Sequence, residues 1–269
     1  MQILRFPRYI HALLAAITLL AVGQPLFAAD PKPVLLYSRY FNAKGETRYL
    51  PDGTYSDVLK RLGETYEVRV HDEPLNADTL QDVAVVLIAN PSDKAVGANP
   101  APPHCTGADV TELSTFVKNG GGLIVMENQE NHNLEVDDFN ALAKAFGMRF
   151  ESRYTDAKKL VLPGDAPIIG GLRWAYYTGN SIVLNPAQSA KPFLVVKNDL
   201  RQKPEKGPRD EPGVLLAAAT LGKGHFVAVT DSGWISNDAL SGKGIADVAI
   251  KEQDNWEIFR RLVKWAAGH

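Results

Sequence analysis

The stretch GGGLIVMENQENHN, residues 120–133, decides the fold because it joins a helix end, a buried strand and a polar loop. Its three glycines supply the open or left-handed backbone that ends a preceding helix. Residues 123–126 are an unbroken apolar run, typical of a strand covered on both faces in a parallel sheet. Only polar side chains follow, at residues 127–133. Because loops at the carboxyl ends of parallel strands form the binding crevice, this stretch also predicts where a site lies.

Other segments repeat the alternation of strand and helix. Apolar runs predict strands over residues 33–38, 83–89 and 224–230. Helical spacing of apolar residues predicts helices over residues 54–63, 109–119, 136–146 and 255–267, the first with Thr54 as its N-cap. Between residues 148 and 219, short β-like runs separated by Pro and Gly predict a β-rich insertion of hairpins. The pattern predicts an α/β three-layer sandwich with a mostly parallel sheet.

The amino terminus predicts a signal peptide over residues 1–29, followed by a single α/β domain over residues 30–269. Arg5 and Arg8 precede an apolar segment at residues 10–22, and Ala28–Ala29 offers a small-residue cleavage site. The apolar segment is short for a bilayer span, although an uncleaved anchor is the alternative. We expect a periplasmic or secreted protein with no stable membrane insertion after cleavage.

Composition narrows the function further. The 269-residue chain is 45% hydrophobic, enough to bury a full core. Its formal charge of −2 offers no basic surface for nucleic acid. Cys105 is the single cysteine, so no internal disulfide is possible. Cys105 could be a nucleophile with His104 as its base. Adjacent residues in an extended loop usually point apart, however, which favours an inert thiol.

Three titratable residues in the predicted carboxyl-edge loops are the catalytic candidates: Glu127, His132 and Asp231. Together they suit an acid–base set or a divalent metal. Ligands one helical turn apart are not apparent, so we predict no metal and no cofactor. The alternative is that such residues cap helices and form Asx-turns.

A second group in the same loops suits a polar ligand. Trp234, flanked by hydroxyl, amide and carboxylate groups, offers the apolar platform and hydrogen-bonding partners that a sugar ring needs. The ligand-binding candidates are Asn90, Asp93, Asn128, Ser232, Trp234 and Asn237. Trp174, Tyr176 and Tyr177 could add an aromatic rim. The alternative is that Trp234 packs beneath the sheet edge and Asp231 caps the next turn.

Several longer segments carry a family resemblance. They are TELSTFVKNGGGLIVMEN, HNLEVDDFNALAKAFGMRF, GKGHFVAVTDSGWISNDAL and NWEIFRRLVKWAAG. Over residues 33–268 the chain resembles the class I glutamine amidotransferase-like superfamily, in a secreted, uncharacterised branch similar to the auxiliary domain of gliding-motility-type ABC transport systems. The resemblance implies a flavodoxin-like sandwich. Active members place a cysteine nucleophile in a strand-to-helix elbow, with a His-Glu pair late in the chain. Here the strand that ends at Met126 is followed by Glu127 and not by a cysteine. The late histidine, His225, lies at the start of a strand and not after it, so glutaminase activity is not expected.

The leading hypothesis is an exported ligand-binding or accessory domain that recognises a carbohydrate or other polar ligand at the carboxyl edge of the sheet. A second hypothesis is a glycan hydrolase that uses Glu127 and Asp231 as acid and base, assisted by His132. A third is a protein–protein module of an envelope complex, using the edge hairpins and the charged loop at residues 201–213.

Overall fold

The computed structural model describes residues 31–128, 135–155, 160–176, 178–185, 187–198, 213–243 and 252–269. The predicted signal peptide, His132, Tyr177 and residues 201–212 lie outside these ranges. Lys32–His269 forms one compact unit. No helix in the described part is both long and apolar enough to cross a bilayer.

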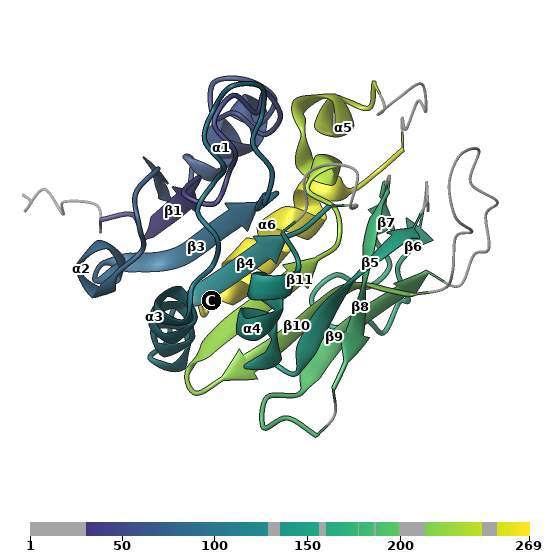
Figure 1. The fold of residues 1–269 in the computed structure, drawn as a ribbon. Coiled ribbons are helices and arrows are strands. Elements are labelled where there is room, and N and C mark those ends of the chain that lie inside the picture. Colours follow the sequence, from purple (N-terminus) through teal and green to yellow (C-terminus); the bar gives the residue numbers. More distant parts are fainter. Residues whose placement is uncertain are drawn as a thin grey trace, which may run out of the picture. The chain divides into compact units, whose positions relative to one another are not determined.

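A nine-stranded sheet organises the described residues, in the order β2-β1-β3-β4-β11-β10-β8-β5, with β9 also paired to β10 (Figure 1). The parallel strands are β2 (Glu67–His71), β1 (Val34–Ser38), β3 (Val83–Ala89), β4 (Gly122–Met126) and β11 (Gly224–Val229). The antiparallel strands are β10 (Gly213–Leu221), β9 (Pro192–Asn198), β8 (Gly179–Leu184) and β5 (Met148–Thr155). A separate pair joins β6 (Leu160–Val161) to β7 (Arg173–Trp174). The predicted hairpins are therefore confirmed.

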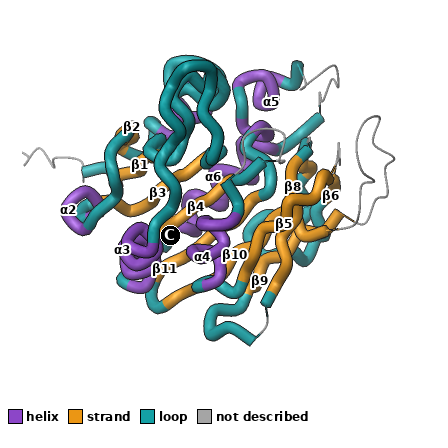
Figure 2. The backbone as a smooth tube through the Cα atoms, viewed as in Figure 1, coloured by secondary structure: helices purple, strands orange, loops and turns teal. Residues whose placement is uncertain are grey.

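Helices cover both faces of the parallel strands (Figure 2). Side chains alternate along each strand, so Leu35 and Tyr37 enter one apolar cluster and Val34 and Leu36 the other. The first cluster includes α1 (Ser56–Leu62) and α6 (Asn255–Ala266), and the second includes α2 (Ala77–Leu80), α3 (Gly107–Lys118) and α4 (Asp137–Lys144). After β11 come the short 3-10 helix η2 (Gly233–Ile235) and α5 (Asn237–Ser241). This arrangement confirms the predicted three-layer α/β sandwich.

Of the three glycines in the opening stretch, Gly120 has the predicted role, and Gly122 instead lies within β4. Gly120 adopts φ +122° just after α3, which a side chain would strain. At Gly122 a Cβ atom would lie 2.4 Å from the carbonyl oxygen of Ala266, so only glycine lets the end of α6 approach β4. The expected cap of the first helix was wrong. That helix begins after Tyr55, because the Thr54 hydroxyl instead accepts a 2.7 Å hydrogen bond from the Tyr49 amide.

The carboxyl ends of the parallel strands meet at one edge. The Asn90 amide donates to the Met126 carbonyl at 2.8 Å, and the Glu127 amide donates to the Val229 carbonyl at 2.8 Å. The side-chain amide of Asn42, from the loop after β1, donates to the Ala89 carbonyl at 2.8 Å. The loops after β1, β3, β4 and β11 therefore leave the sheet side by side, as the predicted fold requires.

Candidate functional site

Ser232 links three of these loops. Its hydroxyl accepts a 3.0 Å hydrogen bond from the Asn90 amide and lies 2.7 Å from the Met126 carbonyl and 3.0 Å from the Glu127 carbonyl. The Tyr55 hydroxyl donates to its carbonyl. With all these contacts made inside the protein, Ser232 stabilises the edge rather than presenting a free hydroxyl to a ligand.

Asn90 and Asn128 form the next part of the edge. The Asn128 side-chain amide donates to the Tyr49 hydroxyl at 2.7 Å and to Asn90 Oδ1 at 3.2 Å. Asn90 turns sharply out of β3 with φ +52°, a left-handed conformation that asparagine tolerates better than most residues. Sequence reasoning missed Tyr49, because nothing in its local pattern indicates that it packs across the sheet edge.

Glu127 occupies an unusual environment. It continues the alternation of Leu123 and Val125, whose side chains lie in the layer beneath α3 and α4. It is 0% exposed, and neither carboxyl oxygen has a hydrogen-bond partner among the described residues. Burial raises the pKa of Glu127 well above its usual range, and the charge of Glu135 adds to this shift. Its interacting carboxyl group is therefore Glu135 and not, as the hydrolase hypothesis assumed, Asp231.

Asp231 belongs to the opposite layer. Its Oδ1 accepts a 2.6 Å hydrogen bond from the Gly233 amide, the turn-forming role that was its alternative interpretation. Burial raises the pKa of Tyr49, and the negative charge of Asp231 raises it further. This places Asp231 beside the buried tyrosines of the α1 side. Its predicted companion His132 lies outside the described residues.

The proposed aromatic platform is wrong. Trp234 is 0% exposed because η2 turns it into the core, against the rings of Trp174 and Phe259. Trp174 and Tyr176 are also buried and cannot form an exposed rim. The buried amide of Asn255 fixes this arrangement by donating to the Trp234 carbonyl at 2.6 Å. The sequence pattern around Trp174 and Tyr176, aromatic residues between turns, is the same for buried and for exposed side chains, so it could not predict their burial.

Asn237 serves as a tether between helices. Its side-chain amide donates to the Gly53 carbonyl and the Ser56 hydroxyl, both at 2.9 Å, and its Oδ1 accepts from the Asp57 amide at 3.0 Å. These bonds connect α5 to the start of α1, which explains the residue structurally. Nothing in these contacts directs Asn237 toward a ligand.

Several other polar atoms at the carboxyl edge are buried without a partner among the described residues. They are Ser38 Oγ, at the end of β1, then Asn90 Nδ2, Ser92 Oγ and Asp93 Oδ1, after β3, and Thr178 Oγ1 and both amide atoms of Asn180, at the start of β8. Buried polar groups are nearly always hydrogen-bonded, so a concentration of exceptions needs a reason. The candidate site is therefore this edge, along which donors (Ser, Thr, Asn), acceptors and the Glu127 carboxyl group are spread from β1 to β8.

The environment of Cys105 does not suit a nucleophile. It is buried, and burial, followed by the negative charges of Asp109 and Glu135, raises the pKa of its thiol far above its usual range. His104 does not activate it, since its Nδ1 instead lies 2.9 Å from Asp138 Oδ2. The interpretation of an inert thiol is supported.

We expect Cys105 to react with a thiol reagent such as DTNB at pH 8 on the order of 100-fold or more slowly in the folded protein than in the unfolded chain, because the thiolate is the reactive form. Absorbance at fixed reagent concentration, with and without guanidinium, measures both rates. Rapid stoichiometric labelling of the folded protein would restore the nucleophile interpretation.

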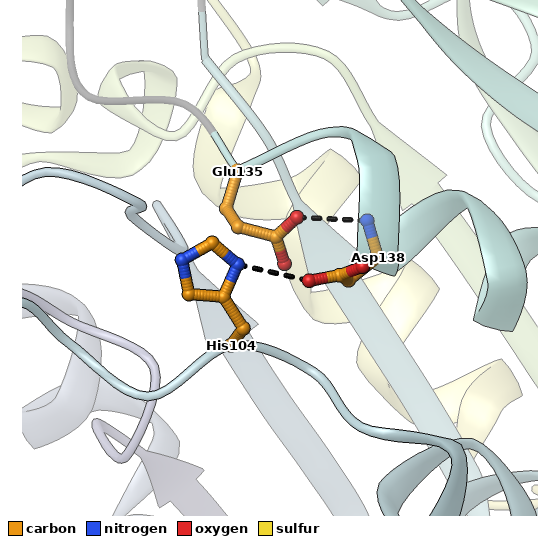
Figure 3. A group of neighbouring side chains, drawn as sticks. All are labelled: His104, Glu135 and Asp138. Carbon is orange, nitrogen blue, oxygen red and sulfur yellow. Dashed lines mark hydrogen bonds and ion pairs between the residues drawn. The ribbon is translucent and has the colours of Figure 1, made fainter.

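Three side chains of the types that can bind a metal lie close together where α4 begins (Figure 3). His104, Glu135 and Asp138 each place a ligand atom within 4.8 Å of the others. The sequence signal was Glu135 and Asp138 at a spacing of three residues across a helix start. It was missed because His104 reaches them only through folding of the proline-rich loop before α3.

A surface cavity of about 400 Å³ lies at the other end of the strands, lined by residues of α2, α3 and the β3 start, including Leu80, Val83 and Phe116. It contains none of the predicted site residues. Its position at the amino-terminal edge separates it from the polar site described above.

Comparisons with known proteins support the fold assignment. No family model and no curated protein matches the sequence. Among solved structures, the mmIFT52 N-terminal domain is similar, with a TM-score of 0.62 and 15% identity, over 87% of this chain and 97% of that one. A ThuA-like protein from Bacteroides uniformis has a TM-score of 0.51 and 12% identity, over 91% and 95%. A ThuA-like protein from Parabacteroides merdae has a TM-score of 0.51 and 13% identity, over 88% and 90%.

The chain therefore shares the α/β fold of the ThuA-like structures. At these identities the likeness shows the fold alone. The function has to be argued from the chain's own residues.

Proposed function

We propose that this chain is an exported binding or accessory domain that takes a polar, uncharged ligand of the carbohydrate type at the carboxyl edge of its sheet. The proposed export depends on residues 1–29, which have the composition of a signal peptide. The sequence resemblance to a transport-associated auxiliary domain favours an accessory role over an independent enzyme.

The proposal rests on the buried polar atoms of this edge that have no hydrogen-bond partner in the described part of the chain. Leaving such a group unsatisfied costs about 1–3 kcal/mol. Ser38 ends β1, and Asn90, Ser92 and Glu127 follow the ends of β3 and β4, so all four lie at the carboxyl edge, where this fold class places its ligands. Several such groups lie at one edge of the sheet. A ligand that supplied the missing hydrogen bonds would explain why they are there.

A mixture of donors and acceptors favours sugar hydroxyl groups. Serine hydroxyls both donate and accept, the amide of Asn90 donates, and a carboxyl group at Glu127 accepts or, when protonated, also donates. Each sugar hydroxyl likewise offers both functions, so vicinal hydroxyls suit such a set. The support comes from these polar groups and not from stacking, because Trp234 is buried.

A thermal-shift screen of the mature chain against neutral mono- and disaccharides at about 10 mM tests the proposal, because a ligand of the native state raises Tm by mass action. We expect one sugar class to raise Tm in the wild type. Ser38→Ala should weaken that binding by about 2–12-fold, the range for a net hydrogen bond. Ser241→Ala, on the exposed side of α5, is the matched control. Absence of a shift across the panel, or equal effects of both variants, would contradict the proposal.

One observation also favours the hydrolase alternative. A general acid needs a carboxyl group with a raised pKa, and burial raises the pKa of Glu127. Its neighbouring carboxyl group is Glu135. Release of nitrophenol from aryl glycosides by the wild type, lost in Glu127→Gln, would favour this alternative over simple binding.

A further inference from the structure

We propose that His104, Glu135 and Asp138 bind a divalent transition-metal ion of the Zn²⁺ or Mn²⁺ type. This inference goes beyond the ligand proposal and does not depend on it. The three residues come from two segments, the loop before α3 and the start of α4, that meet beneath the carboxyl edge.

The spacing of the ligand atoms suits a single ion. His104 Nδ1 and Asp138 Oδ2 are 2.9 Å apart, and Glu135 has a ligand atom within 4.8 Å of both. Two ligands of one ion at about 2.0–2.2 Å lie roughly 3 Å apart. Small side-chain rotations would bring the set into coordination, since the backbone already places all three residues around one point (Figure 3).

Helix capping is the simpler explanation of part of this cluster. Glu135 Oε1 accepts a 2.9 Å hydrogen bond from the Asp138 amide, which satisfies a free amide in the first turn of α4. Capping does not explain the second oxygen. Glu135 is only 3% exposed, and its Oε2 has no hydrogen-bond partner among the described residues. Figure 3 shows this oxygen directed toward His104 and Asp138.

The local charge also requires compensation. Glu135 and Asp138 bring two carboxyl groups together, and the ion pair described for this cluster is the one between His104 and Asp138. A divalent ion would neutralise these neighbouring carboxylates.

The ligand types indicate the kind of ion. An imidazole nitrogen favours Zn²⁺ and other transition metals, and carboxylate oxygens extend the range to Mn²⁺, whereas Mg²⁺ prefers oxygen ligands alone. The side chains of His104 and Asp138 are 51% and 45% exposed, and Glu135 is buried behind them. An ion can therefore enter from solvent and be held by a buried carboxylate.

Isothermal titration calorimetry of the chelator-treated full chain with Zn²⁺, Mn²⁺ and Mg²⁺ tests this site. His104→Ala, Glu135→Gln and Asp138→Asn each remove one ligand. Asp137→Asn is the matched control because it removes the same charge from the same helical turn but lies outside the cluster. His104 and Asp138 are half exposed, so their variants should fold, and circular dichroism verifies this.

We expect one Zn²⁺ or Mn²⁺ per chain, weaker Mg²⁺ binding, and at least about 10-fold weaker transition-metal binding in each ligand variant. Asp137→Asn should keep the wild-type affinity. No transition-metal binding by the wild type would overturn the proposal. So would an equal loss in Asp137→Asn and Asp138→Asn, which would indicate diffuse attraction to an acidic surface, or an unchanged affinity in folded His104→Ala.

Discussion

Replacing Trp234 with alanine is expected to lower the free energy of unfolding by about 3–5 kcal/mol, the range for truncating a buried aromatic side chain. Trp234 is 0% exposed and packs edge-on against Trp174 and Phe259, with ring centroids 5.4 Å and 5.7 Å away. Urea and thermal unfolding measure the loss, at about 2–4 °C of Tm per kcal/mol for a domain of this size.

Trp234→Phe keeps an aromatic ring in the same space and should recover much of the lost stability. This control separates loss of packing from loss of an indole surface. A Trp234→Ala variant that kept wild-type stability but no longer responded to sugars would contradict the core assignment. It would return Trp234 to the exposed platform that its sequence context suggested.

Replacing Glu127 with glutamine is expected to raise stability at pH 7.5, by about 1.4 kcal/mol for each unit between the unfolded pKa and the raised folded pKa or pH 7.5, whichever is lower, because glutamine has no charge to neutralise on folding. Glutamine is nearly isosteric but cannot ionise, whereas Glu127 is buried without a hydrogen-bond partner among the described residues. Most substitutions of buried residues destabilise, so a gain would be diagnostic. Urea unfolding of the wild type, Glu127→Gln and the exposed-site control Glu64→Gln provides the comparison.

The pH dependence of this gain in stability follows from the direction in which the pKa of Glu127 is shifted. Its folded pKa is raised, mainly by burial and then by Glu135. A raised folded pKa contributes stability below the unfolded pKa of about 4.3, and this contribution is lost as pH rises toward the folded pKa. The wild type and Glu127→Gln should thus be equally stable near pH 4 and diverge above it. A lower stability of Glu127→Gln at pH 7.5 would mean that a cation or donor compensates Glu127 in solution.

The fold was predictable because its signals are local. The run at residues 123–126 is apolar on both faces, and a strand with that property needs helices on both sides. The same argument placed Asn90, Glu127 and Ser232 at one edge, since parallel strands end together. Hydrogen bonds from Ser232 to the loops after β3 and β4 agree with that placement.

The side-chain environments were not predictable, because they depend on contacts distant in sequence. Tyr49 meets Asn128 across the edge, and Trp234 turns inward because Asn255 holds its carbonyl. Glu127 and Asp231 follow neighbouring strands but enter opposite layers, which strand alternation decides only once the register is known. His104 joins Glu135 and Asp138 through a loop whose path no local pattern specifies.

Ser92→Ala is the sharpest check on the proposal that a ligand pairs with the polar atoms of the carboxyl edge that have no partner among the described residues. The Ser92 hydroxyl is buried without a partner among the described residues, so its removal should leave Tm unchanged or higher without ligand. The same variant should show a smaller Tm increase with the sugar that stabilises the wild type. A lower ligand-free Tm combined with an unchanged sugar response would contradict the account, because the hydroxyl would then serve the fold alone.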